Sequence, residues 1–539
     1  MADPPADPGR SARTALATRL WGTVCRHIDG MAIGSTMAAL ASHGALRALA
    51  AADRTEFGKL RAGFGAHAGF LHVAIRLLAD QGWVTCAGEG STDELSITAT
   101  PGGRVVMTRL ADGYADAVRF LPVAGRADVD DAVLEPFLDA ARRDWGLPVA
   151  GVPADVRHQV LAHLNGHLIA PIMFGVTRGN RLPAGNAAQI LARQGWVRSD
   201  GGAARLTAAG EVAVALARQY RYPMVYLPLL RSVPELIFGD PPAASSSAGA
   251  VGDDETHLDR DLDIRFSGEV FAATCRAPFL DVALPLFDRE PLAGQPALVI
   301  DMGCGDGTLL ETLYAAVRTQ TGRGSRLGEY PLLMVGADPS PIARGVAAAR
   351  LAAAGVPHLI MDGDIADPSR LARELAAAGH DAGDALHVCK SAIHDRAYQP
   401  PGPPASAPPG PPGGAPPSAP PGAMTAFARP DGSAIPAGQL AQNLAGLFRS
   451  WQPLARRHGW IVIEAHSVRS ATAAALIGRT LATALDATHG YSCQYPAEPE
   501  VFAWASRVGG FTSRAHHEPG ASALGHTQLT IDHFVADRS

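Results

Sequence analysis

The sequence predicts an α/β protein whose parallel sheet follows a mainly helical front region. Three observations support this prediction. Short apolar runs recur along the second half of the chain, and each ends near a charged or polar residue, as buried parallel strands do. Helical spacing of apolar residues fills the segments between these runs, and it also dominates the first half of the chain. We therefore expect alternating strands and helices behind a separate helical region.

The size and composition of the chain indicate several globular domains. Its 539 residues are 47% hydrophobic and 18% charged, which suits roughly two to four domains. The net charge of −6 provides no basic field for nucleic acid or an acidic membrane. The six cysteines form no C-x-x-C pair, and no stretch is apolar for about 18 residues. We expect a cytoplasmic protein that binds neither nucleic acid nor membrane.

Changes in composition divide the chain into four parts. The Pro-rich residues 1–18 predict a disordered tail, 19–240 a helical region, 241–259 a small polar linker, and 260–539 an α/β domain. Inside the last part, the low-complexity stretch 400–422 (PPGPPASAPPGPPGGAPPSAPPG) cannot fill a core and predicts a disordered insert. We expect the chemistry to tolerate this insert.

The helical region contains two degenerate copies of one unit. Each copy reads as helices followed by a hairpin, which predicts two winged-helix-like units that act as a lid or dimerisation region. A DNA-binding regulator is the other interpretation, but the helix at 68–79 has one Arg and no Lys, too little charge to neutralise phosphates. The matching segments are His27–Gly30 with His163–Gly166, Leu77–Val84 with Ile190–Val197, and Ile97–Gly102 with Leu206–Gly210.

The stretch 297–308 (ALVIDMGCGDGT) predicts a strand, a tight turn and the start of a helix. Its apolar run ends at Asp301, and Gly303, Gly305 and Gly307 follow at alternate positions. Glycines are needed where the backbone turns with positive φ and a ligand lies against the main chain. The pattern D-x-G-x-G-x-G is neither a phosphate loop nor the dinucleotide fingerprint. It resembles the first motif of class I S-adenosylmethionine (SAM) methyltransferases, which have a Rossmann-like fold.

Further residues that the sequence predicts to bind SAM follow the next strands. Asp338 ends a second apolar run, where a carboxylate can accept the ribose hydroxyls of a nucleoside. After a third run, Asp364 and Ile365 resemble the family's adenine site, with the acid toward the exocyclic amine and the isoleucine against the ring. Lys390, in the fourth run, completes the predicted cofactor site.

Polar residues after the fourth and fifth runs suggest a metal site. His394 and Asp395 follow the run 385–393, and His466 follows the run 459–465. Because the carboxyl ends of parallel strands meet at one edge, these side chains could converge as the facial triad of non-haem iron. Alternatively, His394 and Asp395 cap the next helix while His466 forms hydrogen bonds within a loop.

These residues resemble metal-dependent C-methyltransferases that act on α-keto acids such as phenylpyruvate, or on malonyl-carrier starter units of polyketide assembly lines. The motifs of the resemblance extend over 301–511, and the stretch 489–496 (HGYSCQYP) favours the polyketide type. The resemblance implies a single metal, iron or manganese, held by His394, Asp395 and His466. It also implies a front region that forms a lid.

The predicted reaction is methylation of an acidic carbon next to a carbonyl, with two substrate oxygens on the metal. Tyr491 and Gln494 are further candidate catalytic residues, and His489, His516 and His517 are other candidates for the base. The predicted partners are an acyl carrier protein or a free keto acid, and a homodimer stays open. One alternative is a metal-independent small-molecule O-methyltransferase that uses His394 or His466 as general base. The other alternative is a SAM-sensing winged-helix regulator.

Overall fold

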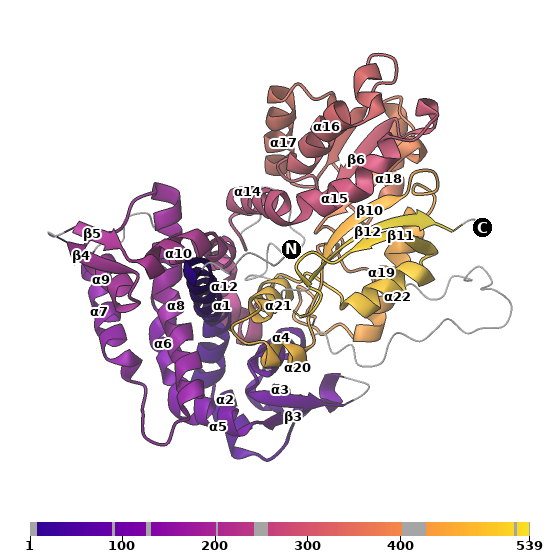
Figure 1. Ribbon diagram of the computed structural model, residues 1–539. Coiled ribbons are helices and arrows are strands. Elements are labelled where there is room, and N and C mark those ends of the chain that lie inside the picture. Colours follow the sequence, from indigo (N-terminus) through magenta and orange to yellow (C-terminus); the bar gives the residue numbers. More distant parts are fainter. Residues whose placement is uncertain are drawn as a thin grey trace, which may run out of the picture. The chain divides into compact units, whose positions relative to one another are not determined.

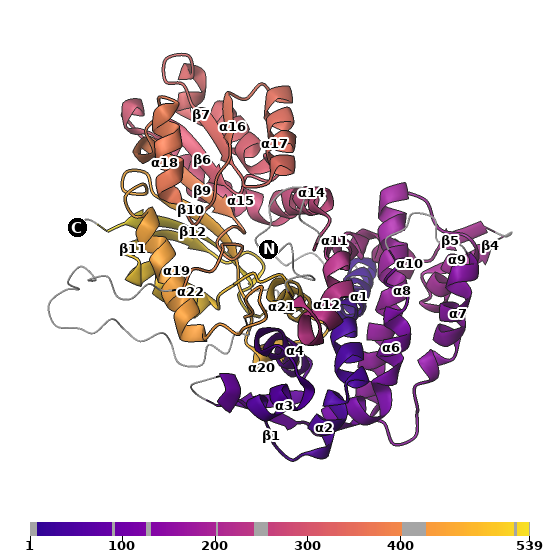
Figure 2. The ribbon, with the colours of Figure 1, turned by 180° about the vertical axis from the view of Figure 1, so that it is seen from behind.

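The computed structural model describes residues 8–88, 92–124, 131–200, 203–241, 257–400, 427–521 and 525–537. The chain divides into two units (Figures 1 and 2), which we term the front unit and the sheet unit. The predicted single domain at 260–539 needs correction, because two of its segments fold with the front unit. The front unit consists of Met1–Ser245, Asp431–Ala434 and Ser470–Ser492, and the sheet unit of Ser246–Pro430, Ile435–Arg469 and Cys493–Ser539.

The front unit is mainly helical. Its helices are α1 (Pro8–Ser42), α2 (Ala45–Ala51), α3 (Phe57–Phe64), α4 (Ala68–Asp80), α5 (Pro101–Val105), α6 (Asp112–Val118), α7 (Asp131–Arg142), α8 (Ala154–Gly179), α9 (Gly185–Arg193), α10 (Ala208–Leu216), α11 (Arg221–Val225), α12 (Leu227–Phe238), α20 (Ser470–Ala475) and α21 (Ala482–Tyr491). Strands β1 (Thr55–Glu56), β2 (Val84–Ala87) and β3 (Ser96–Ala99) form one small sheet in the order β1-β3-β2, and β4 (Val197–Asp200) and β5 (Ala203–Leu206) form a hairpin. The winged-helix interpretation stays a prediction.

The disordered tail predicted at 1–18 is wrong for residues 8–18, because α1 begins at Pro8. Residues 1–7 lie outside the described residues, as do 242–256 of the predicted linker and 401–422 of the predicted insert. By length and composition, two helical stretches of the described chain could cross a membrane, Ala154–Gly179 and Arg260–Phe287, or three if the bent pair α3 and α4 counts as one span. The first is α8, whose apolar residues pack inside the front unit.

The two sequence copies make reciprocal contacts where α1 and α8 meet. A Cβ on Gly30 would lie 2.2 Å from the Cα of His163, and a Cβ on Gly166 would lie 2.3 Å from the carbonyl oxygen of His27. Only glycine allows backbones to approach this closely, which explains why both copies have a His-x-x-Gly motif. Matching hydrogen bonds join Tyr114 to His163 Nδ1 (2.7 Å) and Tyr220 to His27 Nδ1 (2.8 Å).

The sheet unit contains a seven-stranded sheet with helices on both faces (Figure 1). Its strands are β6 (Leu298–Met302), β7 (Leu333–Ala337), β8 (His358–Met361), β9 (Ala385–Lys390), β10 (Trp460–Ala465), β11 (Phe511–His517) and β12 (Leu529–Ala536). Its helices are α14 (Arg260–Val270), α15 (Arg276–Ala283), α16 (Thr308–Gln320), α17 (Pro341–Ala353), α18 (Pro368–Ala377), α19 (Ala437–Trp451) and α22 (Pro499–Val508).

The strands run in the order β11-β12-β10-β9-β6-β7-β8. The strands from β10 to β8 pair in parallel, whereas β12 is antiparallel to both β10 and β11. Successive residues of β6 enter two different cores: Ile300 packs with residues of α18, α19 and α22, and Val299 packs with residues of α15, α16 and α17. A strand that is buried on both faces reads as a continuous apolar run, which is why β6, β7, β9 and β10 are visible in the sequence, while β8 is a half-buried edge strand.

Candidate active site

The glycine turn after β6 leaves open space at one position. Gly303, Gly305 and Gly307 have φ values of +78°, +53° and +77°, so all three adopt the left-handed conformation. A Cβ on Gly303 would lie 3.1 Å from the Cβ of Ala392, whereas a Cβ on Gly305 would meet no described atom within 4 Å. The main chain at Gly305 therefore has room for a ligand against it, as the sequence predicted.

Asp338, just after β7, lies beside this turn. Its Oδ2 accepts a hydrogen bond from the N–H of Gly305 (3.0 Å), and its Oδ1 accepts one from the N–H of Ser340 (2.9 Å). Burial raises the pKa of this carboxyl group, while the two N–H donors lower it in part. The acid predicted to bind ribose is thus oriented by the same turn that is predicted to hold the cofactor.

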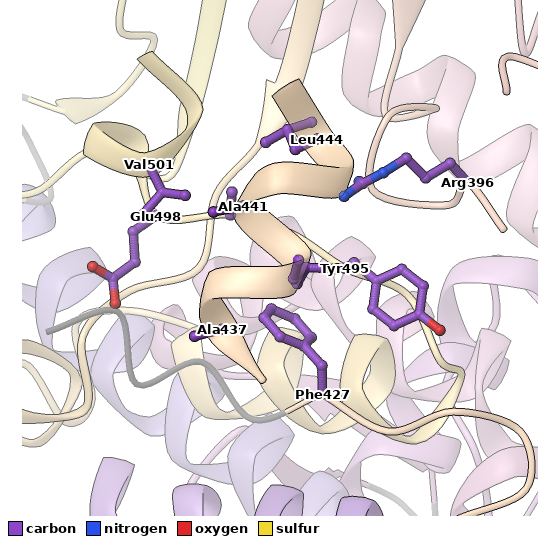
Figure 3. Close-up of a pocket in the computed structure, with 10 residues that line it drawn as sticks. Arg396, Phe427, Ala437, Ala441, Leu444, Tyr495, Glu498 and Val501 are labelled. Carbon is purple, nitrogen blue, oxygen red and sulfur yellow. The ribbon is translucent and has the colours of Figure 1, made fainter. Parts of the chain in front are cut away.

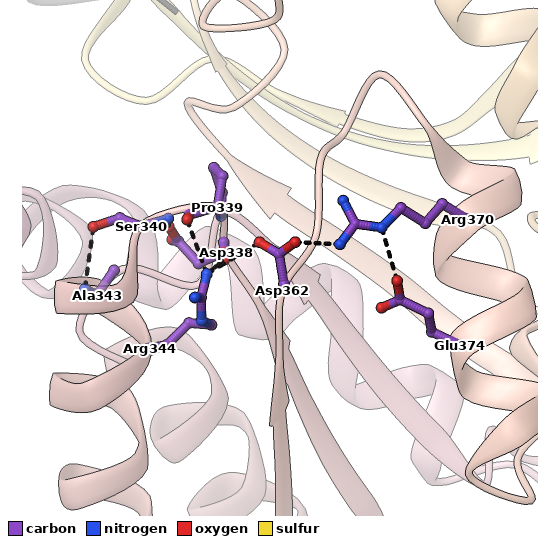
Figure 4. A network of polar contacts seen from close by, with 8 residues as sticks. All are labelled: Asp338, Pro339, Ser340, Ala343, Arg344, Asp362, Arg370 and Glu374. Atoms are coloured by element: carbon purple, nitrogen blue, oxygen red, sulfur yellow. Dashed lines mark hydrogen bonds and ion pairs between the residues drawn. The ribbon is translucent and has the colours of Figure 1, made fainter. Parts of the chain in front are cut away.

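A chain of ion pairs fixes the backbone around Asp338 (Figure 4). Arg344 donates to the carbonyl oxygen of Asp338 (2.7 Å) and to Oδ1 of Asp362 (3.1 Å). Asp362 also pairs with Arg370, which in turn donates to Oε1 of Glu374 (2.7 Å). These contacts link the ends of β7 and β8 to α17 and α18, so the nucleoside end of the predicted site rests on a rigid frame.

Asp301, at the end of the glycine strand, is a buried acid. Its Oδ1 has no hydrogen-bond partner among the described residues. Burial raises its pKa strongly, the charge of Asp338 adds to this rise, and the charge of Lys390 opposes it. Lys390 donates from Nζ to the hydroxyl of Ser267 on α14 (2.7 Å). Because buried polar atoms are normally satisfied, Asp301 fits a site whose bound ligand supplies a donor.

The predicted adenine residues lie after β8. Asp364 accepts a hydrogen bond at Oδ1 from the N–H of Ala366 (2.8 Å), and its side chain is exposed. Ile365 is buried in the core, and its carbonyl oxygen accepts from the indole N–H of Trp451 (2.8 Å). The structure thus places both residues at the carboxyl edge of the sheet, and their roles toward adenine stay predictions.

A buried hydrogen-bonded pair joins the ends of β9 and β10. Glu464, which is 1% exposed, accepts at Oε1 from Nδ1 of His394 at 2.5 Å. The same carboxylate accepts from the backbone N–H groups of Ile393 (3.1 Å) and Ala465 (2.9 Å). Because an ionised carboxylate only accepts, Nδ1 of His394 carries the proton, and Nε2 is the nitrogen that can take up another.

The pKa of His394 reflects this partner. Burial alone would lower it, but the charge and the hydrogen bond of Glu464 outweigh burial, and the charge of Asp395 adds to them, so the pKa is raised. Burial would raise the pKa of Glu464, but the charge and hydrogen bond of His394 outweigh that effect and lower it. A histidine oriented by a buried acid has the arrangement of a general base.

Residues 494 and 495 hold the loop that contains His394. The N–H of Tyr495 donates to the carbonyl oxygen of His394 (2.6 Å), and Nε2 of Gln494 donates to Oδ1 of Asp395 (2.7 Å). The charge of Asp395 also raises the pKa of Asp338, so the two loops are electrostatically linked. The predicted catalytic residue Gln494 therefore contacts Asp395 directly.

His466 has a different environment from His394. Its Nδ1 donates to the carbonyl oxygen of Ala497 (3.1 Å), and its Nε2 accepts from the hydroxyl of Thr530 (2.9 Å). Burial lowers the pKa of its imidazole, with the charge of Glu464 opposing, so the ring is neutral. This matches the alternative in which His466 forms hydrogen bonds within a loop.

The predicted metal triad does not fit this geometry. A metal ligand needs a nitrogen lone pair, and both ring nitrogens of His466 contact protein groups. His394 donates from Nδ1 to Glu464, an arrangement that metal-ligating histidines also have, and Oδ1 of Asp395 accepts from Gln494, so the disagreement lies with His466. Within the described ranges, no group of three or more His, Cys, Asp or Glu side chains is arranged to hold a metal ion. We therefore assign no step of the chemistry to a metal.

The remaining candidates for the base lie elsewhere. His489 and Tyr491 belong to α21 of the front unit, where the Tyr491 hydroxyl is paired with Thr36 (2.8 Å) and burial raises its pKa. His516 lies on β11 and contacts Asp532 (2.8 Å) and Glu518 (3.1 Å), and His517 is its neighbour on that strand.

Glu464 is the functional residue that the sequence reasoning missed. The signal was an acid at the end of an otherwise apolar strand, directly before Ala465 and His466. A charged side chain is rarely fully buried unless it is paired. That rule would have marked Glu464 as the partner of a cation at a neighbouring strand end.

Two family models match parts of the chain. A family model described as "AprA MT2-like domain" matches residues 255–529, and one described as "AprA N-terminal domain" matches residues 20–86. No curated protein matches the chain.

Several solved structures resemble the chain at low identity. An O-methyltransferase family protein from Burkholderia thailandensis is 15% identical, with 68% of this chain and 89% of that chain covered and a TM-score of 0.35. An O-methyltransferase family 2 protein from Planctomyces limnophilus, in complex with apigenin, is 12% identical, with 98% and 97% covered and a TM-score of 0.39. The CurJ carbon methyltransferase is 14% identical, with 78% and 96% covered and a TM-score of 0.35.

Proposed function

The chain belongs to the family of AprA MT2-like methyltransferase domains, and from this premise we propose that it methylates a carbon atom after His394 has removed a proton from it. The chain is a SAM-dependent methyltransferase. The observation that supports the proposal is the buried pair of His394 and Glu464, 2.5 Å apart, at the carboxyl edge of the sheet. This edge is where an open α/β sheet binds its ligands.

When bound, SAM supplies an electrophilic methyl group on a sulfonium. The residues that would hold it are the glycine turn with its open position at Gly305, the oriented carboxylate of Asp338, and Asp301, whose Oδ1 has no partner among the described residues. Asp364, Ile365 and Lys390 belong to the same proposed site. These groups bind and orient, and none of them is needed to accept a proton.

The chemistry of the chain itself is proton removal. Nε2 of His394 takes the proton from the acceptor carbon, and the electron pair of the broken C–H bond stays on the substrate as an enolate. That pair then forms the new carbon–carbon bond to the methyl group, while the methyl–sulfur bond breaks and its electron pair stays on sulfur, which leaves S-adenosylhomocysteine and a protonated His394. Glu464 keeps the proton on Nδ1 and stabilises the imidazolium that forms, which is the role of an orienting acid in a catalytic pair.

The acidity of the acceptor limits the class of substrate. An imidazole can deprotonate carbon only where neighbouring carbonyl groups stabilise the carbanion. We therefore propose a malonyl-carrier thioester, or a related β-dicarbonyl or α-keto acid, in polyketide or other secondary metabolism. The proposed partner is accordingly an acyl carrier protein, or the free keto acid.

A substrate panel tests this proposal. Purified protein is incubated with SAM and, separately, a malonyl-loaded carrier protein, free α-keto acids and a phenolic acceptor, and the products are analysed by mass spectrometry and carbon-13 NMR. We expect a new methyl group on carbon for a member of the first two classes. Methyl transfer to the phenolic oxygen alone would contradict carbon methylation and favour the O-methyltransferase alternative. Parallel reactions with added iron and with a chelator test the metal-dependent form of the reaction.

A further inference from the structure

Side chains join the loop after β9 to α19. Arg396 donates from Nε to Oδ1 of Asn443 (2.9 Å), and Asn443 donates from Nδ2 to the carbonyl oxygen of Gln399 (2.9 Å). Tyr398 donates its hydroxyl to Oε1 of Gln439, one turn earlier on α19 (3.1 Å). We term these five residues the staple. It connects the chain on one side of residues 401–426 to the chain on the other side.

Arg396 also contacts the residue that precedes His394. Its Nη1 donates to the carbonyl oxygen of Ile393 (2.7 Å), while the N–H of Ile393 donates to Oε2 of Glu464 (3.1 Å). The peptide groups on both sides of Ile393 are therefore fixed, one by the orienting acid and the other by the guanidinium. Because His394 follows directly, the direction of its imidazole depends on both contacts.

The charge of Arg396 is buried beside a small hollow. Only 3% of the residue is exposed, and burial lowers its pKa to about 10, so it is a cation at neutral pH. Its guanidinium end is directed toward the part of α19 that contains Ala441 and Leu444 (Figure 3). The hollow that these residues line with Phe427 and Tyr495 has a volume of about 10 Å³, which is space for about one water molecule.

Burial of the Arg396 cation carries a desolvation cost. Its Nη2 has no partner in the described part of the chain. An apolar residue of similar volume would often be at least as stable as a buried charge. The cost of burial therefore argues for a role in ordering the loop rather than in packing alone.

We propose that Arg396 is a positioning residue that fixes the direction of His394, and that the staple isolates this loop from residues 401–426. The proposal rests on the proposed function, because it assigns Arg396 a role only if His394 is the base. A general base works when it is held within a fraction of an ångström of its productive position. Arg396 supplies that restraint at the carbonyl oxygen of Ile393, while Glu464 accepts from the N–H of the same residue.

The test compares kcat, KM for SAM and SAM affinity by calorimetry in Arg396→Met, Arg396→Lys and Asn443→Ala. Arg449→Met is the control for the same arginine-to-methionine change, because Arg449 is exposed on α19, the helix that contains Asn443. We expect kcat to fall about 100-fold in Arg396→Met and about tenfold in Arg396→Lys and Asn443→Ala, since misplacing a catalytic group by about 1 Å has effects of this size. SAM affinity and the Arg449 variant should match wild type.

Three results would overturn the proposal. The first is a wild-type kcat in both Arg396→Met and Asn443→Ala. The second is a loss of SAM affinity that matches the loss of kcat in both variants. The third is a kcat of Arg396→Lys that is no higher than that of Arg396→Met. If Arg396→Met fails to fold, Asn443→Ala decides, because it keeps the guanidinium and removes two bonds of the staple. His394→Gln separates the proposed function from the positioning role of Arg396. Full activity of His394→Gln contradicts the proposed function. An inactive His394→Gln variant together with fully active Arg396 variants contradicts only the positioning role.

A shortened chain tests the second half of the proposal. Residues 401–422 are replaced by a short Gly-Ser linker, and kcat is measured with and without Asn443→Ala. With the staple intact, we expect kcat within about twofold of wild type, because the cost of loop closure changes little with length. A fall in kcat as large as that of Arg396→Met would show that the staple does not isolate the loop.

Discussion

The two histidines at neighbouring strand ends, His394 after β9 and His466 after β10, differ in what their nitrogens contact. His394 donates a hydrogen bond from Nδ1 to a buried carboxylate, and its pKa is raised. His466 is held between a carbonyl oxygen and a hydroxyl, and its pKa is lowered. The same residue type at the same edge of the sheet thus has the arrangement of a general base in one case, and in the other it forms hydrogen bonds within the fold. The difference comes from the partner rather than from the position.

The largest effect should follow loss of the first histidine. In His394→Gln, we expect kcat to fall about 10³-fold, because general bases contribute roughly 10² to 10⁴. SAM affinity, measured by calorimetry, should stay within about twofold of wild type, since His394 does not belong to the predicted cofactor site. Gly305→Val is the contrasting variant: its branched side chain enters the open space at the glycine turn, so SAM binding itself should be lost. Comparable kcat values in His394→Gln and wild type would remove the distinction between the two histidines.

The next largest effect on kcat is expected for Glu464, the acid that orients His394. In Glu464→Gln, we expect kcat to fall about 100-fold, within the range for a group that acts through the base. The active form of His394 is neutral, so wild-type activity rises with pH and has its midpoint above the usual imidazole value of 6.5. Without the carboxylate, burial dominates and lowers the pKa of His394, so the midpoint should move to lower pH. A pH–rate profile with an unchanged midpoint would argue against the pair.

The same pair makes the stability of the fold depend on pH. The raised pKa of His394 gives stability that is present below 6.5 and is lost as pH rises through the folded pKa. The lowered pKa of Glu464 gives stability that is present above 4.5 and is lost as pH falls through the folded pKa. The free energy of unfolding of wild type should therefore exceed that of Glu464→Gln most clearly between these values, as denaturant titrations at several pH values can show.

Much of the fold was predictable because its signals are local. Leu298 to Met302 are buried on both faces, so β6 appears as an apolar run, and the glycines after it are required by backbone conformation. The segment Ser470–Ser492 was assigned to the wrong unit. Its attachment depends on contacts far apart in the sequence, such as the ion pair of Arg76 with Asp486 (2.9 Å) and the hydrogen bond of Gln81 with Thr483 (2.8 Å).

The sequence predicted where the candidate site residues lie on the sheet, but it did not predict which side chains contact one another there. The sequence located His394, Asp395 and His466 at the correct edge of the sheet, because parallel strands share that edge. Which side chains face one another there depends on the loop at 493–497 and on β12, which supply Ala497 and Thr530 to His466. These contacts leave Glu464 as the partner of His394, and no spacing rule in the sequence expresses that choice.

A smaller effect is expected for the second histidine. In His466→Gln, two buried hydrogen bonds are disturbed, which should lower the free energy of unfolding by about 1–3 kcal/mol. Because the ring takes no part in proton transfer, kcat should stay within about tenfold of wild type. Denaturant unfolding and steady-state kinetics on the same preparation measure both. A 10³-fold loss of kcat without a loss of stability would place His466 in the chemistry.

The smallest effect is expected from removing metal. Exhaustive chelation, with elemental analysis to confirm metal-free protein, should leave kcat unchanged, because both ring nitrogens of His466 are engaged with protein groups. Loss of activity that iron or manganese restores would support the metal triad and require His466 to rearrange.

The most direct test follows the proton itself. The substrate identified by the panel is incubated in D₂O with enzyme and S-adenosylhomocysteine, so that deprotonation can occur without methyl transfer, and deuterium uptake at the acceptor carbon is measured by NMR. If His394 is the base, wild type and His466→Gln should both exchange the proton well above the uncatalysed rate, and His394→Gln should not. Exchange by His394→Gln at the wild-type rate would contradict the central claim that this histidine, oriented by Glu464, removes the proton.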